Sequence, residues 1–357
     1  NKQSKKYGDQ TGFKILSKIW RILTMGTSIR EILVFKEVDV DFFKGKTLAV
    51  DAYNVIYQFI TTIVQFDGSP LMDKGGNITS HLSGLFYRNA ELISKGIKLI
   101  YVFDGKHLDC KDEEVARRIG LRQEADDLRK EALRRGSFEE AKKYAKQAHH
   151  ITPQIVEESR KLLNMMGIPW IQALYEGEAQ ATQLVKEGKA FAAVTQDYDA
   201  IVLGCPQVVR NLNKNKDQPI EFFEFDKISK EIEINQEQLV EIALLVGTDY
   251  NDGIKGIGQK TALKIVKENK FYEKWCEYYV VARAQSPNDA EAIDRAKKEA
   301  DLLKSLFLDP AVIKDVEIPK ASGDKEMLKK FLLEKGFSEA RINATIEKLF
   351  PSQKTLF

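Results

Sequence analysis

The segment Ile97-Lys-Leu-Ile-Tyr-Val-Phe-Asp104 decides the class of fold. It is an apolar run of strand length that ends in an acidic residue. A run without polar alternation is typical of a strand buried on both faces, as in a parallel sheet. Lys46-Thr-Leu-Ala-Val-Asp51 has the same form. The two runs therefore predict buried strands that each end in a carboxylate.

Two more apolar runs, at 168–172 and 191–195, come shortly before pairs of acidic residues. Helical patterns separate the four runs, at 55–65, 78–95, 153–166 and 177–187. Thr152-Pro153 is a favourable helix start, and Gly167 is a favourable stop. Strands that alternate with helices predict an α/β fold, with a mostly parallel central sheet flanked by helices. From about 236 onward the chain reads as mostly helical.

The strand ends carry a group of acids. They are Asp51, Asp104, Glu176, Glu178, Asp197 and Asp199. Because parallel strands end at one edge of the sheet, these side chains are expected to meet there. One acid after one strand commonly caps a turn or a helix. Six acids at four strand ends instead favour a site for hard cations such as Mg²⁺ or Mn²⁺. A pair of such metals is the usual arrangement for phosphodiester cleavage.

The stretch from about 105 to 150 differs from its surroundings. It consists largely of charged residues and helix formers, with Gly136 as the clear break. Two helices are expected, at about 111–134 and 138–149, with few large apolar residues to bury. They form either a solvated helical hairpin or a mobile, basic lid over an active site, since lids come from the less stable parts of a fold.

A second informative segment runs from 244 to 266 and centres on Ile254-Lys-Gly-Ile-Gly258. Two glycines around an apolar residue permit a tight turn whose N–H groups can face a phosphate at the next helix. Lys255 and Lys260 add positive charge. The pattern favours a helix-hairpin-helix that binds DNA without reading its sequence, and the alternative is a core helix-turn-helix. The same segment carries a further acid, Asp249.

Composition sets only broad limits. The 357 residues carry a formal net charge of +2, so nucleic-acid binding needs a local basic patch. Three separated cysteines suggest neither a disulfide framework nor a zinc site. No apolar run approaches the roughly 20 residues that span a bilayer. The segment 1–24 has one apolar helical face, which fits either a membrane-surface or partner helix or an extension before a natural start at Met25.

Five motifs, in order, resemble the flap endonuclease family of structure-specific 5′ nucleases, in its archaeal form. They are Val50-Asp51-Ala52, Phe103-Asp104-Gly105, Glu176-Gly-Glu-Ala-Gln180, Gln196-Asp-Tyr-Asp199 and Gly247-Thr-Asp-Tyr250. The similarity runs from Met25 to near the C-terminus. It implies one nuclease domain over 25–350, with a helical arch at about 105–150 and the helix-hairpin-helix region at about 236–269.

The resemblance also implies a chemistry. Two Mg²⁺, which Mn²⁺ can replace, would be held by seven acids: Asp51, Asp104, Glu176, Glu178, Asp197, Asp199 and Asp249. The reaction would be hydrolysis near the base of a 5′ flap in branched DNA, with an accompanying 5′–3′ exonuclease activity, in DNA replication and repair. The alternatives are a related 5′ exonuclease or junction-resolving nuclease, and a non-catalytic DNA-binding scaffold.

Further residues receive roles from the same resemblance. Lys111 and Arg118 in the arch would steer the scissile phosphate and stabilise its transition-state charge. Tyr57 would stack on a base near the cut. The hairpin at Gly256 and Gly258 would grip the downstream duplex, with a bound K⁺.

Two departures from the family pattern concern the ends of the chain. The family begins at a Met-Gly that corresponds to Met25-Gly26, whereas here 24 residues precede it. At the other end, the tail 351–357 keeps Gln353 and Leu356 of a sliding-clamp peptide but lacks its aromatic pair. We therefore expect this tail to bind a sliding clamp weakly. We also expect a monomer without membrane attachment. Its location is expected to be cytoplasmic and nucleoid-associated in an archaeon, or nuclear in a eukaryote.

Overall fold

The computed structural model describes residues 27–106, 120, 124–132, 134–137, 139–140, 143–144, 150–213, 218–283, 286 and 289–350. Its centre is a seven-stranded sheet in the order β1-β7-β6-β5-β2-β3-β4. The strands are β1 (Lys36–Val38), β2 (Thr47–Asp51), β3 (Lys98–Phe103), β4 (Trp170–Gln172), β5 (Ala192–Val194), β6 (Gln207–Arg210) and β7 (Ile220–Glu224).

The four predicted strands are β2, β3, β4 and β5, and all of them run parallel. Strand β6 adds a further parallel pairing with β5. The sheet then reverses, because β6–β7 and β7–β1 are antiparallel. The prediction of a mostly parallel central sheet is therefore confirmed, and the antiparallel end adds to it.

Both faces of the sheet are buried, with alternate residues packing into different cores. On β2, Leu48 and Val50 belong to one apolar cluster, and Ala49 between them belongs to the other. This two-residue period places successive side chains on opposite faces. Because both faces are covered, the strand sequence shows no polar alternation, which explains the apolar runs.

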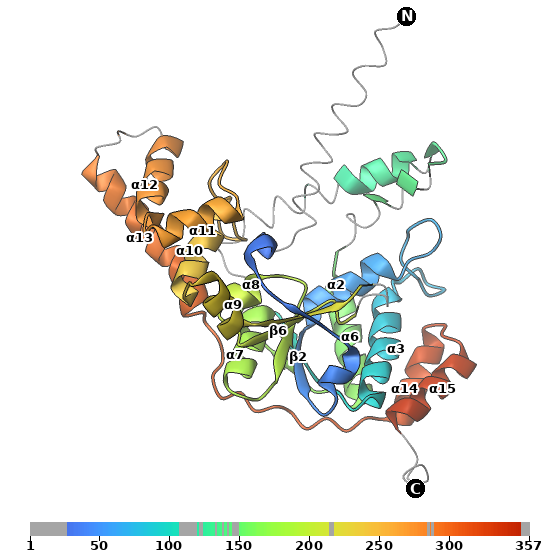
Figure 1. Cartoon of the computed structure of the whole chain (residues 1–357). Coiled ribbons are helices and arrows are strands. Elements are labelled where there is room, and N and C mark those ends of the chain that lie inside the picture. The colour runs from blue at the N-terminus through green and yellow to red at the C-terminus, as the bar shows by residue number, and fades with distance from the viewer. Residues whose placement is uncertain are drawn as a thin grey trace, which may run out of the picture.

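Helices cover the two faces as distinct groups (Figure 1). One group is α2 (Ala52–Thr62), α3 (Ser80–Ser94), α6 (Pro153–Met166), α14 (Lys325–Glu334) and α15 (Glu339–Leu349). The other is α7 (Gly177–Lys186), α8 (Asp199–Val202), α9 (Phe225–Ile232), α10 (Gln236–Val246), α11 (Gln259–Lys267), α12 (Phe271–Ala282) and α13 (Ala290–Leu308). The predicted helices at 55–65, 78–95, 153–166 and 177–187 are present as α2, α3, α6 and α7.

Local signals account for the helix boundaries. The Thr152 side chain accepts a hydrogen bond from the backbone of Ile155, and Gly167 ends α6 in the left-handed conformation at φ 73°. Helix α2 begins at Ala52, three residues before its predicted start, because the Asp51 side chain caps it through the N–H of Asn54. The same aspartate therefore ends a strand and starts a helix.

The region at 105–150 contains helical residues at 124–132, 139–140 and 143–144, separated by a turn in which Gly136 has φ 71°. Figure 1 draws this part apart from the sheet. Lys111, Arg118, the extension 1–24 with Met25-Gly26, and the tail with Gln353 and Leu356 lie outside the described residues. Within the described part of the chain, no helix is both long and apolar enough to cross a membrane.

Candidate active site

All seven predicted acids lie at the carboxyl edge of the parallel strands and interact electrostatically. Burial raises the pKa of Asp51 to about 7, with further contributions from Asp104 and Glu176. Burial also raises the pKa of Glu178 well above its ordinary range, with added repulsion from Asp199. Buried like charges repel strongly because little solvent screens them. The sequence thus predicted a real cluster of carboxylates.

Asp197 joins this cluster to the hairpin region. Burial raises its pKa well above the ordinary range, and repulsion from Asp199, Asp51 and Asp249 adds to the effect. Asp249 comes from the loop between α10 and α11, whereas the other six acids follow strands of the sheet. The site therefore spans the sheet edge and the predicted DNA-binding segment.

Asn54, which sequence reasoning missed, bridges two of the acid-bearing segments. Its side-chain amide donates to Oδ2 of Asp197 at 3.0 Å and accepts from the backbone of Gln196 at 3.1 Å. Its own N–H donates to Oδ1 of Asp51 at 3.1 Å. Its position one helical turn after Asp51 is the sequence signal that points to it. Asn54 therefore fixes the loop that follows β5 against α2.

Asp104 is fixed by the glycine of the Glu176-Gly-Glu178 motif. The N–H of Gly177 donates to Oδ1 of Asp104 at 2.7 Å. A Cβ at position 177 would lie 2.8 Å from that oxygen and 3.0 Å from the carbonyl of Val102. Glycine is required here because the α7 backbone approaches the aspartate so closely.

Hydrogen bonds also hold Glu178, Glu176 and Asp199. Oε1 of Glu178 accepts from the N–H of Ala200 at 3.1 Å. Oε1 of Glu176 accepts from the Tyr250 hydroxyl at 2.9 Å. Oδ1 of Asp199 accepts from both the N–H and the hydroxyl of Thr27. Neither Thr27 nor Tyr250 was singled out from the sequence, although Tyr250 directly follows an acid of a quoted motif.

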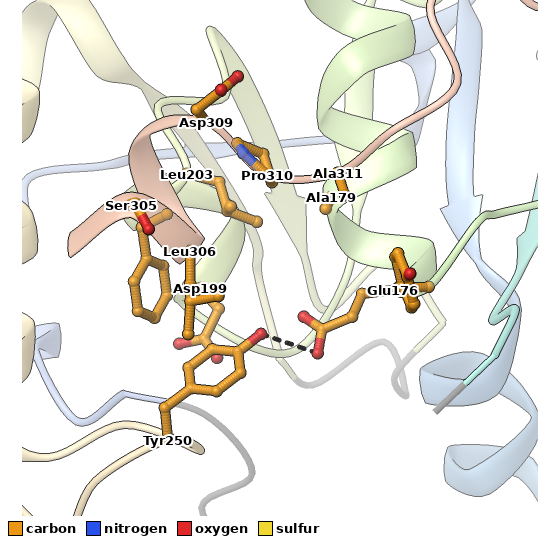
Figure 2. Close-up of a pocket in the computed structure, with 12 residues that line it drawn as sticks. Glu176, Ala179, Asp199, Leu203, Tyr250, Ser305, Leu306, Asp309, Pro310 and Ala311 are labelled. Carbon is orange, nitrogen blue, oxygen red and sulfur yellow. Dashed lines mark hydrogen bonds between the residues drawn. The ribbon is translucent and has the colours of Figure 1, made fainter. Parts of the chain in front are cut away.

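A small pocket of about 140 Å³ adjoins the acids. Figure 2 shows Glu176, Asp199 and Tyr250 among the residues that line it, together with Pro310 and the end of α13. The dashed line in the figure is the bond from Tyr250 to Glu176. The pocket is therefore continuous with the acid cluster.

Positive charge enters the site from the antiparallel end of the sheet. Arg210 on β6 lowers the otherwise raised pKa of Asp197. Its guanidinium donates to the carbonyl of Gln196 at 2.9 Å and to buried Glu221 at 2.8 Å. It also stacks 3.9 Å from the centre of the Tyr198 ring. Arg210 thus holds the loop that presents Asp197.

The cluster has carboxylate chemistry but no closed coordination shell. Among the residues that the structure describes, no three Asp, Glu, His or Cys side chains are arranged as a ready metal site. The donor set nevertheless fits a hard divalent cation, since carboxylate oxygens are its preferred protein ligands. Buried carboxylates with raised pKa values gain from a cation that offsets their repulsion.

The predicted hairpin is present as α10, a loop at 247–258, and α11. Gly256 has φ 90°, and a Cβ at Gly256 or Gly258 would meet nothing within 4 Å. Lys255 and Lys260 are exposed. Gly258 is the N-cap of α11. The turn therefore presents backbone and positive charge to open space, as binding of a phosphate backbone requires.

Tyr57 lies half-buried on α2.

Comparison with known proteins gives the family. The XPG N-terminal domain matches residues 21–125, and the XPG I-region matches 167–249. Flap endonuclease 1 of Methanothermobacter thermautotrophicus is 40% identical over 333 residues, which are 93% of this chain and 98% of the relative. Flap endonuclease 1 of Pyrococcus furiosus is 42% identical over 91% of this chain and 95% of its own.

The chain belongs to the flap endonuclease family.

A solved structure agrees with this assignment. The flap endonuclease-1 of Methanococcus jannaschii aligns with a TM-score of 0.71 and 36% identity, over 91% of this chain and 98% of that one. The catalytic core of Rad2 in complex with DNA substrate aligns with a TM-score of 0.66 at 22% identity, over 93% and 99%, and shows the shared fold.

As a flap endonuclease, this chain is a structure-specific 5′ flap nuclease of DNA replication and repair, and so a DNA-cleaving hydrolase. The family is metal-dependent. The prediction from the five motifs is confirmed at this level. The individual roles of the site residues stay predictions.

Proposed function

We propose that the seven carboxylates hold two Mg²⁺, with Mn²⁺ as a substitute, and that the chain cleaves 5′ flaps by two-metal hydrolysis. The observation that carries this proposal is the set of buried or partly buried, mutually repelling acids at one edge of the sheet. Clustering of this kind costs folding stability, so a functional reason for it is expected. When bound, the ions would activate water and stabilise the leaving oxygen.

The protein's own part in this reaction is to position the acids. Asn54 holds the loop of Asp197, Gly177 holds Asp104, and Tyr250 holds Glu176. These hydrogen bonds limit the movement of the carboxylates before the substrate arrives. Preorganisation matters because small errors in placement reduce rates strongly.

For substrate binding, we propose that Gly256, Gly258, Lys255 and Lys260 contact the downstream duplex, with K⁺ at the hairpin. Tyr57 would stack on a base near the cut, and Lys111 and Arg118 would contact the scissile phosphate. The exposed glycine backbone, the exposed Lys255 in the loop and the exposed Lys260 on α11 support the first part. The family resemblance supports the others.

The same reasoning extends to the protein's setting. We propose an accompanying 5′–3′ exonuclease activity, a monomeric enzyme, and weak sliding-clamp binding through Gln353 and Leu356. Relatives in archaea support a cytoplasmic, nucleoid-associated location. Rates on a flap, a nicked duplex and a four-way junction would separate flap cleavage from the exonuclease and junction-resolving alternatives.

The test of the metal site is Asp199→Ala. This variant is expected to keep its affinity for an end-labelled 5′-flap substrate and to lose Mg²⁺-dependent cleavage by at least about 100-fold, as expected for loss of a metal ligand. Binding is measured by fluorescence anisotropy in Ca²⁺, and cleavage by single-turnover kinetics with mapped cut sites. Normal cleavage by this variant would contradict the assignment.

The arch residues require a separate test. Lys111→Ala and Arg118→Ala are expected to lower the single-turnover rate by about 100-fold, as when a transition-state charge partner is removed. Substrate affinity should change much less. Lys143→Ala, in the same charged region, serves as the comparison. Unchanged single-turnover rates in the first two variants would favour a merely solvated helical hairpin.

A further inference from the structure

Thr27 lies against the acid cluster and bonds to one of its members. The N–H of Thr27 donates to Oδ1 of Asp199 at 2.9 Å, and the Thr27 hydroxyl donates to the same oxygen at 2.6 Å. Thr27 is only 1% exposed, and Asp199 is 9% exposed. Two donors from one residue therefore converge on one buried carboxylate oxygen, across 172 positions of sequence.

The segment that carries Thr27 is held firmly. The carbonyl of Thr27 accepts from the N–H of Ile29 at 3.1 Å, which closes a tight turn. Ile29 is fully buried, and Ile32 is nearly so, in the core that contains α8 and α10. Arg30 pairs with buried Glu221 on β7 at 2.5 Å. Thr27 is thus presented to Asp199 from a fixed backbone.

The same segment also contacts the DNA-binding hairpin. Residues 30–32 form the short 3₁₀ helix η1. The N–H of Glu31 donates to the side chain of Gln259, the first residue of α11, at 2.8 Å. The Glu31 carboxylate lies 3.5 Å from the ammonium of Lys260. Residues 27–31 therefore connect the hairpin helix directly to Asp199.

The physical consequence lies in the orientation of the carboxylate. Two donors on one oxygen restrict rotation of the group and stabilise its negative charge. Asp199 also contributes to the repulsion that raises the pKa values of Glu178 and Asp197. A carboxylate in such a cluster rotates away from its neighbours unless hydrogen bonds hold it. The hydroxyl supplies the shorter of these two bonds.

We propose that Thr27 is a positioning residue that orients Asp199 for divalent-cation binding through its side-chain hydroxyl. This inference rests on the proposed metal role of Asp199. In this role Thr27 would contact neither the substrate nor the ions. It acts through Asp199, in the way that hydrogen-bond partners behind a metal ligand set the ligand's geometry.

The test is Thr27→Val, which keeps the branched shape and the backbone N–H and removes the hydroxyl. The Mg²⁺ concentration that gives half of the maximal rise in melting temperature is expected to increase by about 10-fold, the lower end of the range for such partners. Direct Mn²⁺ binding by electron paramagnetic resonance should weaken to a similar extent. Thr27→Ser, which retains a hydroxyl, should bind Mn²⁺ with an affinity within about 2-fold of that of the unaltered chain.

Thr345→Val and Thr27→Ser are the controls that separate positioning of Asp199 from general stability. Thr345→Val removes another buried threonine hydroxyl, bonded to the carbonyl of Arg341 at 2.9 Å on α15. It should lower the metal-free melting temperature without changing the Mg²⁺ dependence. If Thr27→Val behaves like Thr345→Val, or if Thr27→Ser fails to restore metal binding, the positioning role is wrong.

Asp199→Ala distinguishes this failure from failure of the metal site. If Asp199→Ala binds Mn²⁺ as the unaltered chain does, the proposed function is wrong at this residue and the inference falls with it. If Asp199→Ala loses binding while Thr27→Val keeps it, the metal site stands and only the role of Thr27 is overturned.

Discussion

At the residue scale, Tyr250 links the acid cluster to helix α13. Its hydroxyl donates to Glu176, and its ring packs edge-on against Phe307 at 5.5 Å between centroids. Phe307 lies on α13 and is buried. A neutral donor on a carboxylate stabilises the charge without adding a competing cation. The orientation of Glu176 therefore depends on a residue 74 positions away.

We expect Tyr250→Phe to raise the Mg²⁺ requirement for cleavage and to slow the reaction about 10-fold at limiting Mg²⁺. A hydrogen bond to a charged group contributes roughly 1.5–3 kcal/mol, and the lower end of this range corresponds to an effect of about 10-fold. The measurement is kcat/KM on a 5′-flap substrate as a function of Mg²⁺ concentration. Tyr272→Phe is the matched control, because its hydroxyl bonds to Asp301 on the surface of the α12–α13 pair. Identical Mg²⁺ curves for the two variants would contradict the role of Tyr250.

At the scale of elements, the loop between α10 and α11 is a rigid connection and not a flexible linker. A Cβ at Gly253 would lie 2.3 Å from the carbonyl of Val246, so only glycine fits there. The Asn251 side chain donates to the carbonyl of Leu244 at 2.8 Å. The loop carries Asp249 and continues into the exposed turn at 255–258. The proposed contact of the hairpin with a duplex would therefore act on the same short segment that supplies Asp249.

We expect Lys255→Ala to weaken duplex binding for all sequences alike. Loss of one phosphate contact should reduce the slope of log affinity against log salt concentration by about 1. Anisotropy titrations in Ca²⁺ at several KCl concentrations give this slope. Lys298→Ala is the control, because Lys298 is an exposed lysine of α13 paired with Asp294. An unchanged salt slope for Lys255→Ala would argue for a plain structural hairpin.

At the scale of the whole molecule, the site lies where two helical layers and one sheet edge meet. The rest of the fold must hold these acids together, because their mutual repulsion favours unfolding. The pKa of Asp51 is about 7, compared with an ordinary 3.8, so the folded protein binds more protons than the unfolded one between these values. Stability from this group therefore falls as the pH rises from about 4 to 7. The raised pKa values of Glu178 and Asp197 act in the same direction.

We therefore expect Mg²⁺ to raise the melting temperature more at pH 8 than at pH 6. At pH 6 the ions must displace protons from the cluster, whereas at pH 8 they neutralise charges that are already present. Groups such as Glu158 and Glu187, whose pKa values are lowered to about 2, titrate outside this window and cancel in the comparison. Melting curves with EDTA and with millimolar Mg²⁺ measure the difference. An equal or smaller shift at pH 8 would count against the cluster as a cation site.

The sequence by itself determined the parallel strands, the main helices and the gathering of the acids. Apolar runs mark strands buried on both faces, and the geometry of a parallel sheet then brings their ends together whatever the details of packing. Asp51 and Asp104 could be placed for this reason. The motifs also determined the family. The reversal between β6 and β7 was not predicted, because the pairing direction of short strands depends on their partners more than on their own residues.

Only the tertiary structure decided which groups hold the acids. Thr27, Asn54 and Tyr250 reach the carboxylates of Asp199, Asp197 and Glu176 across 172, 143 and 74 positions of sequence. A hydroxyl or amide has no periodic signature, and its partner is set by the packing of whole elements. The distribution of charge in the cluster follows from burial, which is also a property of the folded chain. The sequence therefore identifies the acids that are expected to bind cations, and the fold determines how each of them is held.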